Sequence, residues 1–191
     1  MHITNWKKEI LTIPNMLSVF RIALIPVYVA LYLNADAAED YRNAGLILAL
    51  SCMTDLVDGK IARKFNMISN VGKVLDPLAD KLTQLALLLC LCTHRKNLRL
   101  LLVLFLIKEF WQLFAMIGAM RRGKALDGAL MSGKISTTVL FSGLGLMFLF
   151  PGMSDRTART IINVCTVVLM YAFADYARAY FGKNKKIYDL E

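Results

Sequence analysis

Four aspartates between positions 55 and 80 stand at the ends of two apolar segments: Asp55, Asp58, Asp76 and Asp80. The first two are three residues apart and the last two are four apart, so each pair would share one face of a helix. Ionised carboxylates beside hydrocarbon are costly, and they usually pair with a cation, bind a metal or line a wet cavity. The pattern therefore predicts a metal site inside a membrane protein.

The ligand chemistry limits which metal this site could hold. A set made only of carboxylate oxygens suits Mg²⁺, Mn²⁺ or Ca²⁺ and disfavours zinc. Four carboxylates close together repel each other unless cations neutralise them, so we expect two ions. Paired ions a few ångströms apart can bridge phosphate oxygens and assist a leaving group. The aspartates therefore indicate chemistry on a phosphate ester.

The residues between the aspartates fit a bulky phosphate ligand. Gly59 follows Asp55 by one turn and leaves room for a ligand to approach the backbone. Arg63 follows one turn later and could reach a phosphate. Gly72 would share the face of Asp76 and Asp80, because the three are spaced at i, i+4 and i+8.

Composition predicts an all-α, polytopic membrane protein. Apolar residues make up 57% of the 191 residues, and the mean hydropathy is +0.51. A helix needs roughly 20 apolar residues to cross a bilayer. Six blocks qualify as spans: Asn15–Leu33, Ala44–Ala62, Gly72–Cys92, Leu98–Met120, Gly133–Phe150 and Ala158–Phe181. We expect residues 1–12 to form an interfacial amphipathic segment, 13–182 the six-helix domain and 183–191 a basic tail.

Basic residues orient these spans. With both termini cytoplasmic, the inside set is Lys7, Lys8, Lys60, Arg63, Lys64, Lys73, Arg121, Arg122, Lys124, Lys134, Arg178, Lys183, Lys185 and Lys186. The outside set is smaller: Arg42, Arg95, Lys96, Arg99, Arg156 and Arg159. This bias places the aspartates at the cytoplasmic face. It also accounts for the net charge of +9, and no motif indicates a nucleic-acid module.

Other catalytic chemistries find little support. The four cysteines lie in apolar runs and read as inert packing residues: Cys52, Cys90, Cys92 and Cys165. The two histidines lie in a terminus and a loop, and neither a Ser/His/Asp arrangement nor a phosphate-binding glycine loop occurs. A cation transporter would also need intramembrane carboxylates, but it would spread polar residues through the depth of several spans. Here they gather at one end.

The spacing of these residues matches a known signature. The pattern Asp55-x-x-Asp58-Gly59-x-x-Ala62-Arg63, then eight residues, then Gly72-x-x-x-Asp76-x-x-x-Asp80 resembles that of the CDP-alcohol phosphatidyltransferases. Three further elements resemble the phosphatidylglycerophosphate synthase and cardiolipin synthase branch: Ile13-Pro14-Asn15-Met16-Leu17-Ser18 with Arg21, Leu75-Asp76-Pro77-Leu78-Ala79-Asp80-Lys81, and Gly133-Lys134-x-x-Thr137. The resemblance covers residues 13 to 180.

The resemblance implies a six-helix enzyme of the bacterial cytoplasmic membrane, usually a homodimer, that moves the phosphatidyl group of CDP-diacylglycerol to an alcohol and releases CMP. It implies that Asp55, Asp58 and Asp76 bind metal and that Asp80 is shared between a second metal and the general-base role. It further assigns four residues to the CDP moiety: Gly59, Ala62, Arg63 and Gly72.

The acceptor alcohol is less sharply defined. Lys134, Lys108 and Arg121 could contact an acceptor phosphate, which favours glycerol 3-phosphate. However, Ser136 stands where that branch often has a second lysine, and Lys108 stands where an arginine is common. Phosphatidylglycerol is therefore the alternative acceptor, which would make the enzyme a cardiolipin synthase; another CDP-alcohol phosphotransferase is a further alternative. A family member that had lost catalysis is disfavoured, because all four aspartates remain.

Two charged residues in the spans have alternative interpretations. Arg21 could line a cavity or pair with a carboxylate such as Glu109. Asp175 and Arg178 are three residues apart on the last span, and we expect them to pair with each other.

Overall fold

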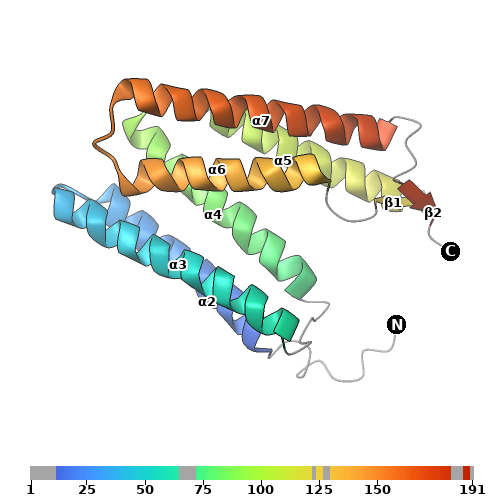
Figure 1. Ribbon diagram of the computed structural model, residues 1–191, viewed down its shortest axis with the longest axis horizontal. Coiled ribbons are helices and arrows are strands. Elements are labelled where there is room, and N and C mark those ends of the chain that lie inside the picture. The colour runs from blue at the N-terminus through green and yellow to red at the C-terminus, as the bar shows by residue number, and fades with distance from the viewer. Residues whose placement is uncertain (1–11, 65–71, 122–123, 127–129, 182–186, 190–191) are drawn as a thin grey trace. The chain divides into compact units, whose positions relative to one another are not determined.

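The computed structural model describes residues 12–64, 72–121, 124–126, 130–181 and 187–189 (Figure 1). These residues form six helices: α2 (Ile13–Leu33), α3 (Ala38–Lys64), α4 (Gly72–His94), α5 (Leu98–Met120), α6 (Met131–Leu149) and α7 (Asp155–Phe181). Two short strands, β1 (Lys124–Leu126) and β2 (Ile187–Asp189), pair antiparallel. The chain divides into two compact units, residues 1–90 and 91–191.

In the first unit, α2 and α3 lie side by side and antiparallel (Figure 1). Asn34 ends α2, and its side-chain amide donates to the carbonyl of Ala30 at 2.8 Å. Asp40 then stabilises the start of α3, because its carboxylate accepts the backbone N–H groups of Asp36 and Ala37. These local contacts fix the short turn between the two helices, so that α2 and α3 pack along their lengths.

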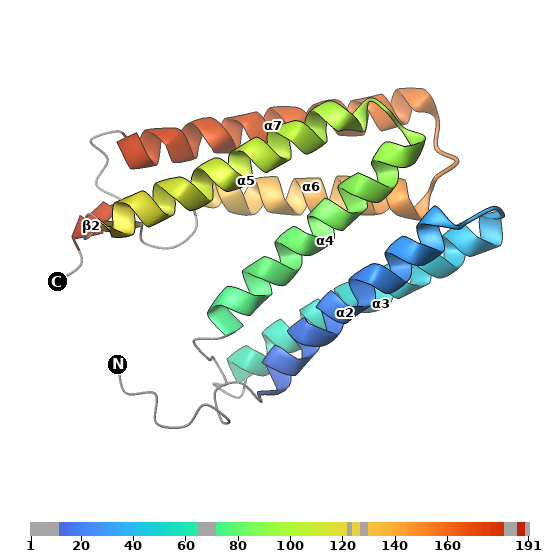
Figure 2. The ribbon, with the colours of Figure 1, turned by 180° about the vertical axis from the view of Figure 1, so that it is seen from behind.

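Buried aromatic and small residues hold the first unit together. Tyr28 and Tyr32, one turn apart on α2, are both buried, as are Ala44 and Leu48 on α3. The ring of Tyr32 meets that of Tyr41 edge to face, with 5.2 Å between centroids. Helix α4 lies beside α2 (Figure 2), and side-chain contacts described below join the two.

In the second unit, α6 and α7 lie side by side and antiparallel, and α7 also packs on α5 (Figure 1). A small residue permits close approach of α6 to α7: a Cβ on Gly143 would lie 2.8 Å from Sγ of Cys165. Cys165 is buried, and the four cysteines, all within the described residues, form no disulfide. The prediction of buried thiols is confirmed for Cys90 and Cys165, whereas Cys52 and Cys92 are only partly buried.

The helix bounds agree closely with the six predicted blocks, but composition supports fewer spans. Within the part of the chain that the structure describes, four helices are long and apolar enough to cross a membrane: α2, α5, α6 and α7. Helices α3 and α4 have sufficient length, with 27 and 23 residues. Their charged residues lower the apolar content, so spans through α3 and α4 stay a prediction.

Exposed apolar side chains support a membrane environment. Helix α5 exposes Leu100, Val103, Ile107, Phe110 and Phe114, each at least half exposed. Soluble proteins rarely leave so continuous an apolar face in water.

The predicted interfacial segment, residues 1–12, lies outside the described residues except for Thr12. The β1–β2 pair was not predicted, since three-residue strands have no periodic signal.

Candidate active site

Helices α2 and α4 join through two parallel side-chain contacts. Nη1 of Arg21 donates to Oδ1 of Asp80 at 2.6 Å. Oγ of Ser18 donates to Oδ1 of Asp76 at 2.5 Å. Because Ser18 and Arg21 are three residues apart on α2, and the aspartates are four apart on α4, the contacts form two successive rungs. Two of the four signature carboxylates are therefore held by side chains of α2.

Burial differs across these rungs. Ser18 and Arg21 are buried, at 0% and 3% exposure, whereas the Asp80 side chain remains 42% exposed. Arg21 is therefore a fixed cation at the base of the site, and Asp80 presents an accessible carboxylate held in one orientation. Hydrogen bonds to a charged group are stronger than neutral ones and restrict its rotamers.

The other half of the signature lies at the end of α3. Asp55, Asp58, Gly59, Ala62 and Arg63 all fall within Ala38–Lys64, whose helical backbone confirms the face-sharing spacing of the two aspartates. The side chains of residues 55–64 lie outside the described part of the chain. Gly72 begins α4 and is buried. The structure therefore places the signature on the two predicted helices.

The donor set fits a hard divalent cation. Asp76 and Asp80 offer carboxylate oxygens one turn apart, which is the ligand chemistry of Mg²⁺ and Mn²⁺. Among the described side chains, no group of three or more carboxylate, imidazole or thiol residues converges. The two described aspartates would thus need the α3 aspartates to complete a metal site.

Arg21 and Glu109, named above as one possible pair, each have a partner within their own unit. Arg21 donates to Asp80, and Glu109 accepts from Nζ of Lys108 at 2.8 Å. Lys108 is buried, at 4% exposure, and its Nζ lies 5.6 Å from the centroid of the Tyr176 ring. The charge of Lys108 is therefore largely balanced within its own unit.

Two other residues predicted to contact an acceptor phosphate differ from Lys108. Lys134, in the first turn of α6, and Arg121, just after α5, are both exposed. Both remain accessible to an anionic ligand. Ser136, at the position where a second lysine is common, is buried at 3% exposure.

The start of α6 is docked on α7 by contacts that the sequence did not reveal. The backbone N–H of Leu130 donates to Oη of Tyr176 at 3.2 Å, and Oγ of Ser132 donates to Oδ2 of Asp175 at 2.6 Å. A Cβ on Gly133 would lie 2.6 Å from Oη of Tyr176. The glycine of the Gly133-Lys134 element therefore allows the close approach that fixes where Lys134 emerges.

The predicted pairing of Asp175 with Arg178 was wrong. Asp175 accepts from Ser132 of the neighbouring helix, and no ion pair joins the described side chains of Asp175 and Arg178. Arg178 is exposed. Helical spacing made the pair geometrically possible, but the Asp175 carboxylate accepts a short hydrogen bond from the Ser132 hydroxyl instead.

Sequence reasoning missed Ser18, Ser132 and Tyr176. Ser18 had a signal, since it lies three residues before Arg21 and thus on the same helix face, ready to match a carboxylate pair. Ser132 and Tyr176 had none, because their contacts join helices far apart in sequence.

Comparison with known proteins gives a consistent assignment. Residues 11–172 match the CDP-alcohol phosphatidyltransferase family. A cardiolipin synthase (CMP-forming) of Streptomyces coelicolor is 36% identical over 171 residues, covering 88% of this chain and 76% of that protein. CDP-diacylglycerol–glycerol-3-phosphate 3-phosphatidyltransferases of Rickettsia bellii and Rickettsia prowazekii are 45% and 44% identical over 71 residues, covering 37% of this chain and 38% of each relative. With the family signature complete on α3 and α4, the chain belongs to the CDP-alcohol phosphatidyltransferase family and is a membrane-embedded transferase.

Proposed function

We propose that this enzyme transfers the phosphatidyl group of CDP-diacylglycerol to a hydroxyl of a glycerol phosphate unit and releases CMP. The observation that carries the proposal is the pair of rungs between α2 and α4, which holds Asp76 and Asp80 in fixed orientations with Asp80 accessible. A carboxylate held in this way can accept a proton from an attacking hydroxyl.

The proposed site uses all four aspartates. Asp55, Asp58, Asp76 and Asp80 would hold two Mg²⁺ or Mn²⁺ ions, which supply positive charge to the diphosphate when bound. Gly59, Ala62, Arg63 and Gly72 would take the CDP moiety.

In the transfer step, Asp80 accepts the proton of the acceptor hydroxyl. The hydroxyl oxygen forms a bond to the phosphorus that carries the diacylglycerol, and the bond from that phosphorus to the CMP oxygen breaks. Arg21 would restrict Asp80 to one orientation throughout this step, since its guanidinium donates to the carboxylate.

Phosphatidylglycerol is the acceptor that the observations favour. The cardiolipin synthase of S. coelicolor is similar over 88% of this chain, whereas the Rickettsia enzymes match over 37%. Lys108 is buried and paired with Glu109, and Ser136 replaces a cation with a buried hydroxyl. A site with fewer available cations suits the singly charged phosphodiester of phosphatidylglycerol better than a phosphate monoester.

Glycerol 3-phosphate, which the sequence analysis favoured, is the second candidate. Lys134 and Arg121 are both exposed and could bind its phosphate. The names of the Rickettsia relatives support the same acceptor over the shorter matched region. The two acceptors share the attacking group, a glycerol hydroxyl, and differ in the charge that the site must hold.

The cellular setting follows as part of the same proposal. Six spans with both termini and the active site at the cytoplasmic face of a bacterial membrane fit the distribution of basic residues. Homodimerisation remains an expectation from the family.

A direct assay tests the proposal. Purified enzyme is given CDP-diacylglycerol, Mg²⁺ or Mn²⁺ and each acceptor in turn, and CMP and the lipid product are measured. We expect cardiolipin from phosphatidylglycerol and no product after EDTA treatment. Phosphatidylglycerophosphate as the product would select the second candidate.

A variant tests the role of the Asp80 carboxylate. Asp80→Asn should abolish CMP release, whereas Asp36→Asn, at an exposed turn, is the matched control. Full turnover by Asp80→Asn would refute the role of this carboxylate.

A further inference from the structure

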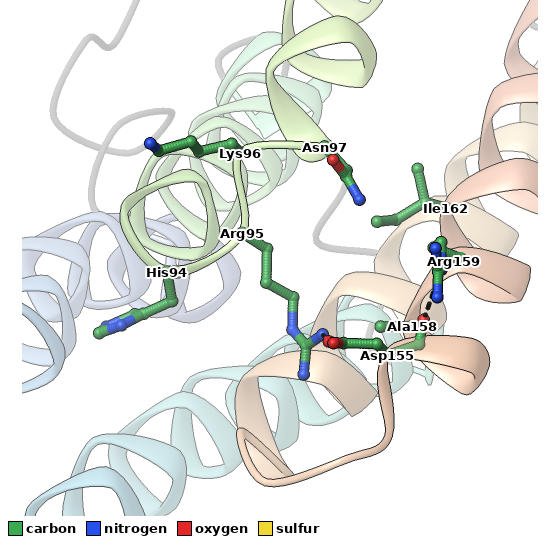
Figure 3. Close-up of a pocket in the computed structure, with 8 residues that line it drawn as sticks. All are labelled: His94, Arg95, Lys96, Asn97, Asp155, Ala158, Arg159 and Ile162. Atoms are coloured by element: carbon green, nitrogen blue, oxygen red, sulfur yellow. Dashed lines mark hydrogen bonds and ion pairs between the residues drawn. The ribbon is translucent and has the colours of Figure 1, made fainter.

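A cavity of about 230 Å³ lies in the second unit, between the turn that joins α4 to α5 and the start of α7 (Figure 3). Its lining residues are His94, Arg95, Lys96, Asn97, Asp155, Ala158, Arg159 and Ile162. At about 30 Å³ per water, the cavity has room for some seven or eight waters, or a small phosphate ester. No step of the proposed reaction uses it.

The charge around the cavity is strongly positive. Five cations belong to the cavity or to the adjoining first turns of α5 and α7: Arg95, Lys96, Arg99, Arg156 and Arg159. The acidic residue that lines the cavity is Asp155, whose side chain is 83% exposed. These five make up all but Arg42 of the basic residues expected on the outer side. The outer cations are thus concentrated at one cavity, although positive charge is generally depleted on that side.

Helix formation gives no reason for this concentration. Arg99, Arg156 and Arg159 lie in the first turns or at the start of their helices, where the helix dipole disfavours cations. Ser154 already stabilises the start of α7, since its Oγ accepts the N–H of Thr157 at 3.2 Å. A bound anion would turn these unfavourable placements into favourable ones.

The polar groups of the cavity are oriented toward a shared space. Figure 3 shows Arg95, Asn97 and Arg159 around the opening, whereas His94 and Lys96 point away from it. Asn97 makes no capping hydrogen bond to α5, which leaves its amide directed at the cavity.

Arg95 is held in place before any ligand arrives. It donates to Oδ1 of Asp155 at 2.7 Å and to the carbonyl oxygen of Met153 at 2.8 Å, and its side chain is 19% exposed. A guanidinium with fixed orientation loses little conformational entropy when it binds a phosphate.

We propose that this cavity binds the phosphodiester group of an anionic phospholipid, with Arg95 and Arg159 as its cationic contacts. We assign the phosphodiester to a lipid because of where the cavity lies. The apolar helices α5 and α7 both begin at the cavity, which places it at the boundary between the hydrocarbon core and the lipid headgroups. None of its lining residues is a signature aspartate, and the proposal does not depend on which acceptor the enzyme uses.

Calorimetric titration of the purified full-length enzyme in neutral detergent tests this inference. The probe is dihexanoyl-phosphatidylethanol, an anionic phosphodiester without a hydroxyl that could react. Dihexanoyl-phosphatidylcholine tests the need for net negative charge, and inorganic phosphate tests the need for a lipid. We expect binding of the first probe only.

Arg159→Gln should weaken that binding about tenfold or more, because a charged hydrogen bond to phosphate is lost. Arg159 is exposed, so the variant should fold normally. Arg42→Gln is the matched control, since Arg42 is an exposed cation of the same predicted side that pairs with Glu39 away from the cavity. Wild-type affinity in Arg159→Gln, or an equal loss in Arg42→Gln, would overturn the proposal. Equal binding of inorganic phosphate would replace the lipid with a free anion.

Discussion

Arg21 and Asp80 lie 59 positions apart in the sequence, yet Nη1 of the first donates to Oδ1 of the second at 2.6 Å. The arginine is almost fully buried and the carboxylate is not. Helix α2 therefore does more than anchor the chain in the membrane. Together with the bond from Ser18 to Asp76, it fixes the orientation of half of the signature carboxylates.

Arg21→Gln should lower kcat about tenfold, because Asp80 loses a charged hydrogen bond that contributes about 1.5–3 kcal/mol in general and less at this partly exposed site. KM for CDP-diacylglycerol should change less than kcat. Steady-state kinetics with purified enzyme measure both.

Arg21→Lys separates a positioning role from a structural one. It keeps the cation and should recover part of the lost rate, whereas a purely structural effect would reduce the melting temperature of both variants alike. An unchanged kcat in Arg21→Gln would show that Asp80 does not need this contact.

Ser18→Ala should weaken the apparent affinity for Mg²⁺ or Mn²⁺ by several-fold. The hydroxyl holds Asp76 in its orientation at 2.5 Å, and without it the carboxylate samples other rotamers before it can bind a cation. Metal titration of the EDTA-treated enzyme, followed by CMP release and by thermal stabilisation, measures the shift. Ser142→Ala, in α6 and exposed, is the control. Equal metal affinity in Ser18→Ala and wild type would contradict the prediction.

The helices were more predictable than the contacts between them. Predicted blocks and observed helices coincide for Leu98–Met120 and differ by a few residues elsewhere, because runs of apolar residues mark helix length directly. The family signature likewise predicted that Asp76 and Asp80 belong to the site. Their hydrogen-bond partners on α2 could be identified only from the packing of the helices, since nothing local links Arg21 to a carboxylate 59 positions away. For the same reason Asp175 was expected to pair with Arg178, although it accepts from Ser132 on the neighbouring helix.

Gly133→Ala should destabilise the protein by about 1–3 kcal/mol, the usual cost of overpacking. The added methyl would lie 2.6 Å from Oη of Tyr176, which also accepts the N–H of Leu130 and so holds the start of α6. Thermal unfolding in detergent measures the change. Gly145→Ala on the same helix is the matched control, because a Cβ there meets no atom within 4 Å and alanine favours helix. Equal melting temperatures for the two variants would show that the Tyr176 side chain can move away from the added methyl without loss of stability.

Lys108→Met should reduce stability, because it leaves the half-buried carboxylate of Glu109 without its cation. Adding Glu109→Gln should restore part of the loss, and a double-mutant cycle on melting temperatures measures the coupling. Lys134→Met, at an exposed position, should leave stability unchanged and raise KM for the acceptor. If Lys108→Met raised only the acceptor KM, Lys108 would be an acceptor contact after all.

Cysteine labelling decides whether α3 and α4 cross the membrane, which composition alone leaves open. Single cysteines are placed at Asp36, Lys64, Arg121 and Ser154 in a background without the four native cysteines. If all six helices span, Asp36 and Ser154 should be labelled from one side, and Lys64 and Arg121 from the other.

The informative position is Lys64, the last residue of α3. With α3 as a span, Lys64 lies on the side opposite Asp36, together with Arg121. If neither α3 nor α4 spans, position 64 is labelled from the same side as position 36, whereas position 121 is still labelled from the other side because α5 crosses in both cases. An impermeant maleimide applied to intact cells and to inverted vesicles distinguishes the two. If positions 64 and 36 are labelled from the same side, the six-span topology is wrong. The end of α3, with Asp55 and Asp58, would then lie on the face opposite the cytoplasmic headgroup of CDP-diacylglycerol.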